Sequence, residues 1–319
     1  MTTELLIQHN DKLFLPAVLD PVILTTERKA TPGTLRFKVL DDGVLQVSEG
    51  DHIRFKVNGN NVFYGFIFKL QKDKDFTIDL TAYDQLRYLK NKDTYVYENK
   101  TAAEVIKMIA DDFKMQTGVL DDTKYKIPTR VKENTSLVDI IQDALDMTLE
   151  NEKQMYVMYD EFGKITLRNL DNMKLDILID EETAQNYEYV SSIDSNTFNK
   201  IKLTYSNKKT GTRDVFIAQH GENINKWGVL QYFENIQEGE NGKAKADALL
   251  ELYNKKTRNL TIKNAFGDIR VRAGSMLPVI LNLGDLQLKN YMLVEKCKHE
   301  FSNEQHTMDL TLRGGEFVA

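Results

Sequence analysis

Apolar and polar residues alternate with a period of two in several short runs along the first ninety residues of the chain. The runs at 35–39 and 53–57 each place three apolar side chains on one face, which is typical of a strand buried on one side. The Asn-Gly-Asn-Asn sequence at 58–61 tolerates a positive φ and predicts a hairpin turn into a long strand at 62–70. A charged turn then leads to another alternating run at 76–80. We therefore expect a small antiparallel β-barrel or sandwich here.

The pattern changes to helical spacing near residue 100. Thr101 and Glu104 have the spacing of a capping box, and the apolar residues that follow predict a helix over 102–116. Ser136 can cap a second helix, because it precedes another apolar stripe with helical period. These helices need an apolar surface to pack on, and a hairpin predicted at 155–168 can provide it. The pattern therefore indicates a small α+β segment.

The alternating pattern returns from residue 186 and is interrupted by one helix near 243–256. We therefore predict three domains. Residues 1–90 form a first β-barrel, residues 91–185 form an α+β middle domain with two helices and a hairpin, and residues 186–319 form a second β-barrel with a helical insertion. The expected fold class is α+β and mainly β, with two similar antiparallel β-barrel domains flanking a small α+β middle domain.

The two β regions repeat the same order of elements. Gly50 precedes a predicted strand in the first region, and Gly274 precedes one in the second. A long strand, a polar turn and a closing strand follow in both regions, and the closing strands at 77–81 and 307–311 share four of five residues. This order indicates a duplicated β-domain. If three copies of such a chain closed around a cyclic axis, the ring would present six similar faces with threefold symmetry.

Three segments resemble a known family of phage proteins. They are the run at 94–106, the strand around Gly65 that leads to 81–84, and the chain ending at 306–314. These segments resemble the XkdQ/YqbQ-like proteins of phages and phage-like elements, and the resemblance covers essentially the whole chain. Those proteins are similar to the baseplate hub proteins of contractile tails, and more distantly to phage late-control protein D and to the hub part of type VI secretion spikes.

The resemblance implies a structural role. It implies a homotrimeric hub with two tube-like barrel domains per subunit, set between a hexameric tail tube and a trimeric spike protein of the same particle. The expected location is the tail baseplate of a virion or phage-like particle that is assembled in the bacterial cytoplasm. The alternative is a tail-associated protein that binds or degrades the cell wall.

Charge and cysteine content exclude several other classes of protein. The 48 acidic and 42 basic residues give a net charge of −6 and form no long block of one sign, which argues against sequence-specific nucleic-acid binding. No apolar run approaches the ~18 residues of a membrane span, so we expect no membrane insertion by this chain. Cys297 is the only cysteine, which excludes intrachain disulfides and four-cysteine zinc modules.

Two sequence features match the pattern of a ligand site only in part. The run at 239–243 lies between a strand and a helix, but its glycines are too close together for a phosphate loop, and Ala244 replaces the metal-binding hydroxyl. Cys297 and His299 share one face of a strand, and His306 could reach them across a hairpin turn. A fourth metal ligand is not evident. We predict no cofactor and no metal, with a turn at the first feature and a structural or interface role for the second.

The acidic pairs do not have the geometry of a hydrolase site. Adjacent acids at 111–112, 121–122 and 181–182 diverge on a helix or a strand, whereas glycoside hydrolysis needs two carboxyl groups that face each other across a cleft. The sequence also lacks the metalloprotease and serine-hydrolase motifs. We therefore expect no catalytic residues and no enzymatic activity.

One strand carries bulky aromatic side chains on both faces, with Phe63 on one face and Tyr64, Phe66 and Phe68 on the other. Only Lys69 adjoins this cluster, so a nucleic-acid stacking platform is not favoured. The pattern predicts that the chain's own core covers one face and a neighbouring subunit covers the other. The predicted interface residues are Phe63, Tyr64, Phe66, Phe68, Tyr291, Leu293 and Met308.

Overall fold

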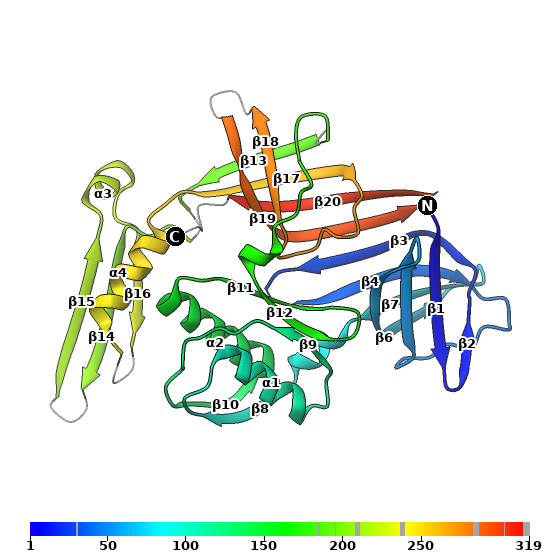
Figure 1. Cartoon of the computed structure of the whole chain (residues 1–319), viewed down its shortest axis with the longest axis horizontal. Helices are drawn as coiled ribbons and strands as arrows, with labels where there is room; N and C mark the ends of the chain where they lie inside the picture. The colour runs from blue at the N-terminus through cyan, green and yellow to red at the C-terminus, as the bar shows by residue number, and fades with distance from the viewer. Residues whose placement is uncertain are drawn as a thin grey trace. The chain divides into compact units, whose positions relative to one another are not determined.

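The computed structural model shows a chain built mainly from β-strands, with a few helices, which confirms the predicted fold class. It forms two compact units (Figure 1). The larger unit combines Met1–Glu188 with Leu260–Leu312, and the smaller unit combines Tyr189–Asn259 with the chain end from Arg313. The structure describes residues 1–29, 31–183, 186–194, 196–207, 211–236, 240–282, 287–302 and 304–314.

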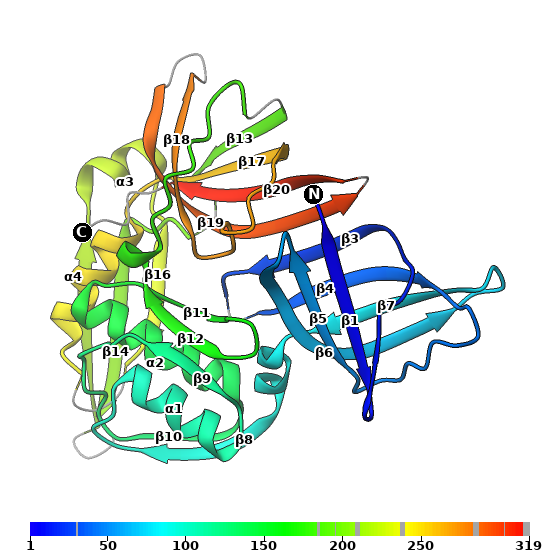
Figure 2. The same ribbon diagram turned by 45° about the vertical axis from the view of Figure 1, so that its right-hand side comes forward.

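The N-terminal strands form a curled antiparallel sheet in the order β3-β4-β7-β6-β5-β1-β2 (Figure 2). Asn58 and Gly59 have φ values of 49° and 78° in the β5–β6 turn, which confirms the predicted hairpin. The inward side chains of these strands form one apolar core around Phe37, Phe55 and Ile67. The strands are β1 (Thr3–His9), β2 (Lys12–Phe14), β3 (Val18–Glu27), β4 (Thr31–Leu40), β5 (His52–Val57), β6 (Asn60–Lys72) and β7 (Thr77–Tyr83).

The middle of the chain packs two helices on a hairpin, as predicted. The Thr101 hydroxyl accepts from the Glu104 N–H at 3.2 Å and the Glu104 carboxylate accepts from the Thr101 N–H at 2.6 Å, which confirms the capping box. Ser136 caps the second helix. The elements are η1 (Gln85–Lys90), β8 (Lys92–Tyr97), α1 (Ala102–Asp112), β9 (Thr117–Leu120), β10 (Arg130–Ser136), α2 (Leu137–Glu152), β11 (Tyr156–Asp160), β12 (Ile165–Asn169) and η2 (Leu170–Met173).

The C-terminal strands join the N-terminal sheet. The path β13-β17-β20-β19 continues into β3, because the second half of β19 (296–301) pairs antiparallel with β3 (22–27), and β18 pairs with the first half of β19. All of these strands therefore belong to one twelve-stranded sheet. They are β13 (Asn186–Ser192), β17 (Thr257–Phe266), β18 (Met276–Asn282), β19 (Gln287–Ser302) and β20 (Gln305–Gly314).

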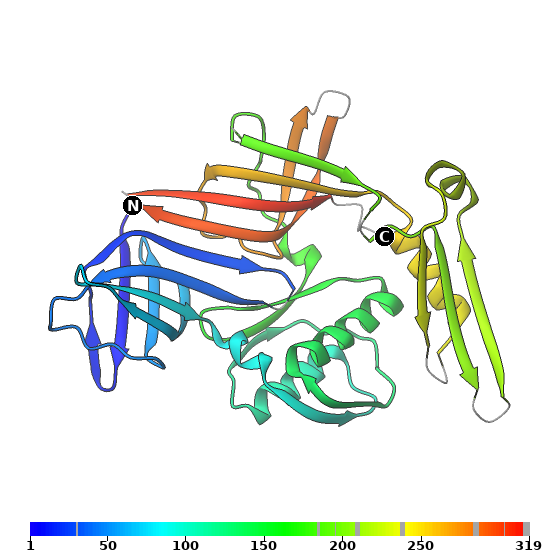
Figure 3. The same ribbon diagram turned by 180° about the vertical axis from the view of Figure 1, so that it is seen from behind.

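The smaller unit is a three-stranded sheet with a helix on one face (Figure 3). The strand order is β15-β14-β16, and Ala246 and Leu249 of α4 pack against Ile201 and Leu203 of the central strand. The predicted insertion helix near 243–256 is α4. The elements are β14 (Lys200–Asn207), β15 (Thr212–Gln219), α3 (Gly221–Trp227), β16 (Gln231–Asn235) and α4 (Gly242–Tyr253).

These two units differ from the three predicted segments 1–90, 91–185 and 186–319. The segment from 186 onward is divided, because 189–259 forms its own core and 260–312 belongs to the larger unit. The physical reason is the length of β19: its sixteen residues extend beyond β18, and the extension binds β3. In the described part of the chain, no helix combines the length and apolar character needed to span a bilayer.

The internal repeat predicted from the sequence is present in the strand order. The path β3-β4-β7-β6-β5 in the first β region matches β13-β17-β20-β19-β18 in the second. Gly50 and Gly274 both have φ of 94°, and their N–H groups donate at 2.8 Å to the carbonyl groups of Ile67 and Val294 in the long strands. Corresponding positions of the closing strands are buried, namely Ile78, Leu80 and Ala82 in β7 and Met308, Leu310 and Leu312 in β20.

We expect Gly65→Ala to destabilise the N-terminal sheet. A Cβ at this position would overlap the backbone oxygen of Tyr83 and lie 2.7 Å from the Phe63 ring. The substitution should lower the free energy of unfolding by about 2 kcal/mol, measured by urea denaturation. Gly221→Ala is the control, because a Cβ there meets nothing within 4 Å, and its effect should stay within about 0.5 kcal/mol. Equal stability of the two variants would contradict the close approach of β6 and β7.

Candidate interaction surface

The outer face of β6 carries an aromatic cluster. Tyr64, Phe66 and Phe68 are half-buried and point away from the core that contains Phe63 and Ile67. This alternation confirms the predicted distribution of the aromatic side chains over the two faces of the strand.

The chain itself covers much of this outer face. Phe162 lies 5.7 Å from Tyr64, and Tyr88 of η1 lies 5.6 Å from Phe66, as measured between ring centroids. The Arg87 guanidinium lies 5.2 Å from the centre of the Phe68 ring. The cover that we predicted from a neighbouring subunit is thus supplied in part by η1 and the β11–β12 turn.

Sequence reasoning did not identify Phe162 as a member of this cluster. Phe162 and Gly163 form the two-residue turn between β11 and β12, with φ values of 48° and 87°. A Cβ on Gly163 would lie 2.7 Å from the Tyr64 ring, so the turn fits closely over β6. The only sequence signal is a bulky aromatic residue in a tight turn, where polar residues are common.

The seven predicted interface residues fall into two groups. Phe63, Leu293 and Met308 are buried at 4%, 1% and 0% exposure, so their side chains pack inside the chain and have no surface to offer a partner. For these three residues the predicted interface role is corrected to a core role, because they lie on the inward faces of their strands. For Tyr64, Phe66, Phe68 and Tyr291, which keep exposed surface, a subunit interface stays a prediction.

Three residues, Asp84, Asp160 and Arg272, form a buried polar group that connects three segments of the larger unit. Asp84, at the end of β7, accepts hydrogen bonds from the N–H groups of Gly33 at 2.7 Å and Leu86 at 3.0 Å. Arg272, before β18, donates to the backbone oxygen of Asp160 at 3.0 Å. Its guanidinium also lies 3.7 Å from the Tyr159 ring centre. A cavity of about 50 Å³ lies beside these groups, which help to line it.

Burial shifts the acidity of both carboxyl groups in this cluster. Desolvation raises the pKa of Asp84 well above its ordinary value, and the neighbouring charge of Asp160 raises it further. Desolvation also raises the pKa of Asp160, to about 6, although a hydrogen bond from Gly163 opposes this shift. Compared with the unfolded chain, the folded chain therefore favours the protonated form of these two carboxyl groups, and burial also lowers the pKa of the neighbouring Arg272.

Cys297, His299 and His306 form a hydrogen-bonded group. His299 Nε2 lies 2.8 Å from the Val271 oxygen and 3.2 Å from the Cys297 sulfur, and His299 Nδ1 lies 2.8 Å from His306 Nε2. Burial lowers the pKa of both histidines to about 4 and raises the pKa of the Cys297 thiol. Both ring nitrogens of His299 thus have partners within the chain, and among the described residues no group of side chains has the geometry to hold a metal ion.

The described part of the 239–243 run has a capping role. Gly239 lies outside the described residues. Asn241 caps α4 by accepting from the Ala244 N–H at 3.1 Å, and Lys243 pairs with Asp247. This part of the run therefore organises the start of the helix.

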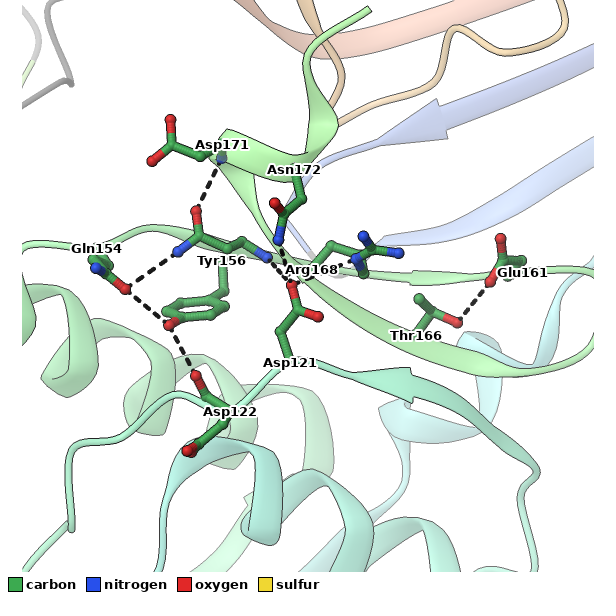
Figure 4. Close-up of polar contacts among 10 residues, drawn as sticks. Asp121, Asp122, Gln154, Tyr156, Glu161, Thr166, Arg168, Asp171 and Asn172 are labelled. Carbon is green, nitrogen blue, oxygen red and sulfur yellow. Dashed lines mark hydrogen bonds and ion pairs between the residues drawn. The ribbon is translucent and has the colours of Figure 1, made fainter.

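Four acids of the predicted pairs contact structural partners through their carboxylates, and Asp122 does so through its backbone oxygen. Asp121 accepts from the Asn169 N–H at 2.8 Å and lies 3.4 Å from the Arg168 guanidinium, whereas Tyr156 donates to the backbone oxygen of Asp122 at 3.1 Å (Figure 4). In the pair at 111–112, Asp111 binds Lys107 and Asp112 accepts from the Tyr95 hydroxyl at 2.9 Å. Glu181 accepts from the Asn282 N–H at 3.3 Å. Apart from the Asp111–Lys107 pair, which lies within α1, these contacts connect different elements of the fold.

Comparison with known proteins places the chain in a family. A family model described as YQBQ-like matches residues 22–313. The chain belongs to the YqbQ-like family. Within this family, the phage-like element PBSX protein XkdQ of Bacillus subtilis is 32% identical over 310 residues, which are 94% of each protein.

The fold of this YqbQ-like chain recurs in solved structures of tail proteins. The 43 kDa tail protein of prophage MuSo2 from Shewanella oneidensis superposes with a TM-score of 0.72 at 10% identity, over 97% of this chain and 98% of that protein. The E. coli c3393 protein, a type VI secretion component described as structurally similar to the phage T4 tail proteins gp27 and gp5, gives 0.59 at 9% identity. That match covers 98% of this chain and 77% of c3393.

The buried polar group should make the stability of this YqbQ-like chain depend on pH. The contribution of Asp160 to the free energy of unfolding is fully present below its ordinary pKa of 3.8. It is lost as pH rises through about 6, because the folded chain favours the protonated form of this carboxyl group. Asparagine cannot titrate, but it can still accept from the Gly163 N–H. Between about pH 4 and pH 7, the wild-type free energy of unfolding should fall by about 1 to 3 kcal/mol relative to Asp160→Asn.

Urea denaturation across this pH range measures the difference. The control is Asp171→Asn, at an exposed position, whose difference from wild type should change by less than about 0.5 kcal/mol. A constant difference between wild type and Asp160→Asn would contradict the shifted pKa of Asp160.

Proposed function

We propose that this protein is the structural baseplate hub of a contractile phage tail or phage-like injection particle. Three copies form a pseudo-sixfold ring that joins the hexameric tail tube to the trimeric spike protein. The protein then resides in the tail baseplate and is assembled in the bacterial cytoplasm. Membership of the YqbQ-like family and the tail-protein fold support this proposal.

The duplicated strand order is the observation that carries the proposal. Each chain supplies two runs of five strands in the same order within one sheet, a first module β3-β4-β7-β6-β5 and a second module β13-β17-β20-β19-β18. Two similar modules in one chain allow a threefold assembly to present six similar surfaces, as a junction between sixfold and threefold partners requires.

The joint between the two modules suggests how neighbouring copies would bind. Within one chain, the second half of β19 in the second module pairs with β3 in the first. The counterpart of β19 is β6, and the counterpart of β3 is β13. If the copies repeat the same joint, the second half of β6 in one copy pairs with β13 of the next.

Both of these edges are available in the described chain. Beyond Ile67, β6 pairs only with β7, and β13 is the last strand of its sheet. Tyr187 and Val190 on β13 are 42% and 44% exposed. Unpaired strand edges with exposed apolar side chains favour association, and pairing around a ring would satisfy them.

We infer a role without turnover. In two of the acidic pairs, the Asp121 carboxylate binds Arg168 and the Asp112 carboxylate accepts from the Tyr95 hydroxyl, so these carboxylates have structural partners. No observation on the described residues favours the alternative of cell-wall binding or cleavage.

Cross-linking of engineered cysteines tests the ring. We expect the purified double variant Lys69→Cys, Val190→Cys to give covalent trimers on a denaturing gel after treatment with a flexible bis-maleimide. Cys297 should not interfere, because it is fully buried and burial raises the pKa of its thiol, which lowers its reactivity. Light scattering on the untreated wild-type protein should give the mass of a trimer.

Each single-cysteine variant is a matched control and should give no covalent trimer. A monomeric mass at all concentrations would overturn the ring. A trimeric mass without cross-linking in the double variant would overturn the β6–β13 joint and leave the trimer in place.

A peptidoglycan assay tests the absence of turnover. Purified protein incubated with dye-labelled bacterial cell walls should release no more dye than buffer, with lysozyme as the positive control. Release above buffer would contradict a purely structural hub.

A further inference from the structure

Phe76 is the most exposed large apolar side chain of the described residues, at 76% exposure. It lies in the β6–β7 turn with φ of 55°, in the left-handed region that bulky side chains seldom adopt. Leu40, at the end of β4, is 41% exposed and pairs with Thr77, the residue after Phe76. Two exposed apolar residues therefore lie at the same end of the N-terminal sheet.

The surrounding hydrogen bonds hold this turn in place. The Asp73 carboxylate accepts from the Thr77 hydroxyl at 2.6 Å and from the Asp75 N–H at 3.0 Å. The Phe76 carbonyl accepts from the Asp41 N–H at 2.8 Å, and Lys72 pairs with the Asp41 carboxylate at 2.9 Å. These bonds fix the backbone around an exposed aromatic ring, so little conformational freedom remains to be lost on binding.

The second module lacks this feature at the corresponding turn. There the His306 carbonyl accepts from the Gly267 N–H at 2.8 Å, just as the Phe76 carbonyl accepts from the Asp41 N–H in the first module. His306 points inward, where its ring stacks on Phe301 at 4.3 Å between centroids. Phe266 takes the place of Leu40 and is 47% exposed. The modules therefore match in backbone and carry an exposed apolar residue at the Leu40 position, and they differ at the Phe76 position, where the ring is exposed in the first module and turned inward in the second.

We propose that Phe76, with Leu40 beside it, is an anchor that inserts into an apolar pocket of a threefold-symmetric partner protein, the trimeric spike. This rests on the proposed ring, in which Phe76 occurs three times and not six. Three anchors match three equal pockets on a trimer, whereas a hexameric partner would meet Phe76 at only alternate subunits. Exposed aromatic side chains on fixed backbone are typical of residues that dominate binding energy.

The backbone of Phe76 provides a test that separates binding from folding. Glycine adopts a positive φ without steric cost, so Phe76→Gly removes strain while it removes the ring. We expect Phe76→Gly and Phe76→Ala to keep the wild-type oligomeric mass and to unfold at no lower temperature than wild type. Both should bind the purified spike protein of the same particle about 30-fold more weakly, measured by biolayer interferometry.

Phe266→Ala is the matched control, because it removes an exposed ring from the second module. It should bind the spike protein with wild-type affinity. Binding of the purified tail tube protein should be unchanged in all three variants.

The outcomes separate the anchor from the ring. Wild-type spike affinity in both Phe76 variants, a loss confined to the tail tube protein, or no spike binding by the wild-type chain would each overturn the anchor. A monomeric wild-type chain would overturn the proposed ring and the threefold argument with it. A trimeric chain whose spike binding does not depend on Phe76 would overturn the anchor alone.

Discussion

Antiparallel pairing between β19 and β3 is the contact on which the architecture of the larger unit depends. Residues 296–301 pair with 22–27, although the two strands are separated by most of the sequence. The Arg28 side chain reinforces the pairing through two hydrogen bonds to the Glu295 carboxylate, at 2.8 and 3.0 Å. Without this contact the two β modules would be separate sheets, each with exposed edges.

Two copies of a module that pair once within a chain leave two strand edges unpaired, one equivalent to the edge of β19 and one equivalent to the edge of β3. The β19–β3 pairing is made within the chain, whereas in the described residues the corresponding strands β6, beyond Ile67, and β13 each have a strand partner at one edge only. Where corresponding side chains differ between the two modules, as Phe76 and His306 do, the modules can bind different partners. The matching backbones of the two modules give the chain a repeated surface. The turn side chains that differ between them give it a surface that occurs once per chain.

The middle segment is attached to the β modules by two different kinds of contact. The aromatic cluster brings Phe162 and Tyr88 onto the outer face of β6. The buried polar group brings Asp160 and Arg272 next to Asp84. The aromatic contact buries apolar surface, whereas the polar contact takes carboxyl groups out of water, where hydrogen bonds compensate and burial raises their pKa. Both contacts join segments far apart in sequence.

Local chemistry in the sequence was enough to predict the elements. The capping box at Thr101, the cap at Ser136, the turn at Asn58 and Gly59 and the repeated strand order are confirmed because each depends on neighbours in the chain or on a period of two or 3.6. The resemblance at 94–106 and 306–314 correctly indicated the family.

Only the tertiary structure decided which surfaces are free. Periodicity shows that β6 has two apolar faces, but it cannot show that η1 and the β11–β12 turn fold back over one of them. It also could not place Leu293 and Met308 in the core, or join β19 to β3. Burial and strand pairing depend on contacts between residues hundreds of positions apart, and a local pattern carries no information about such partners.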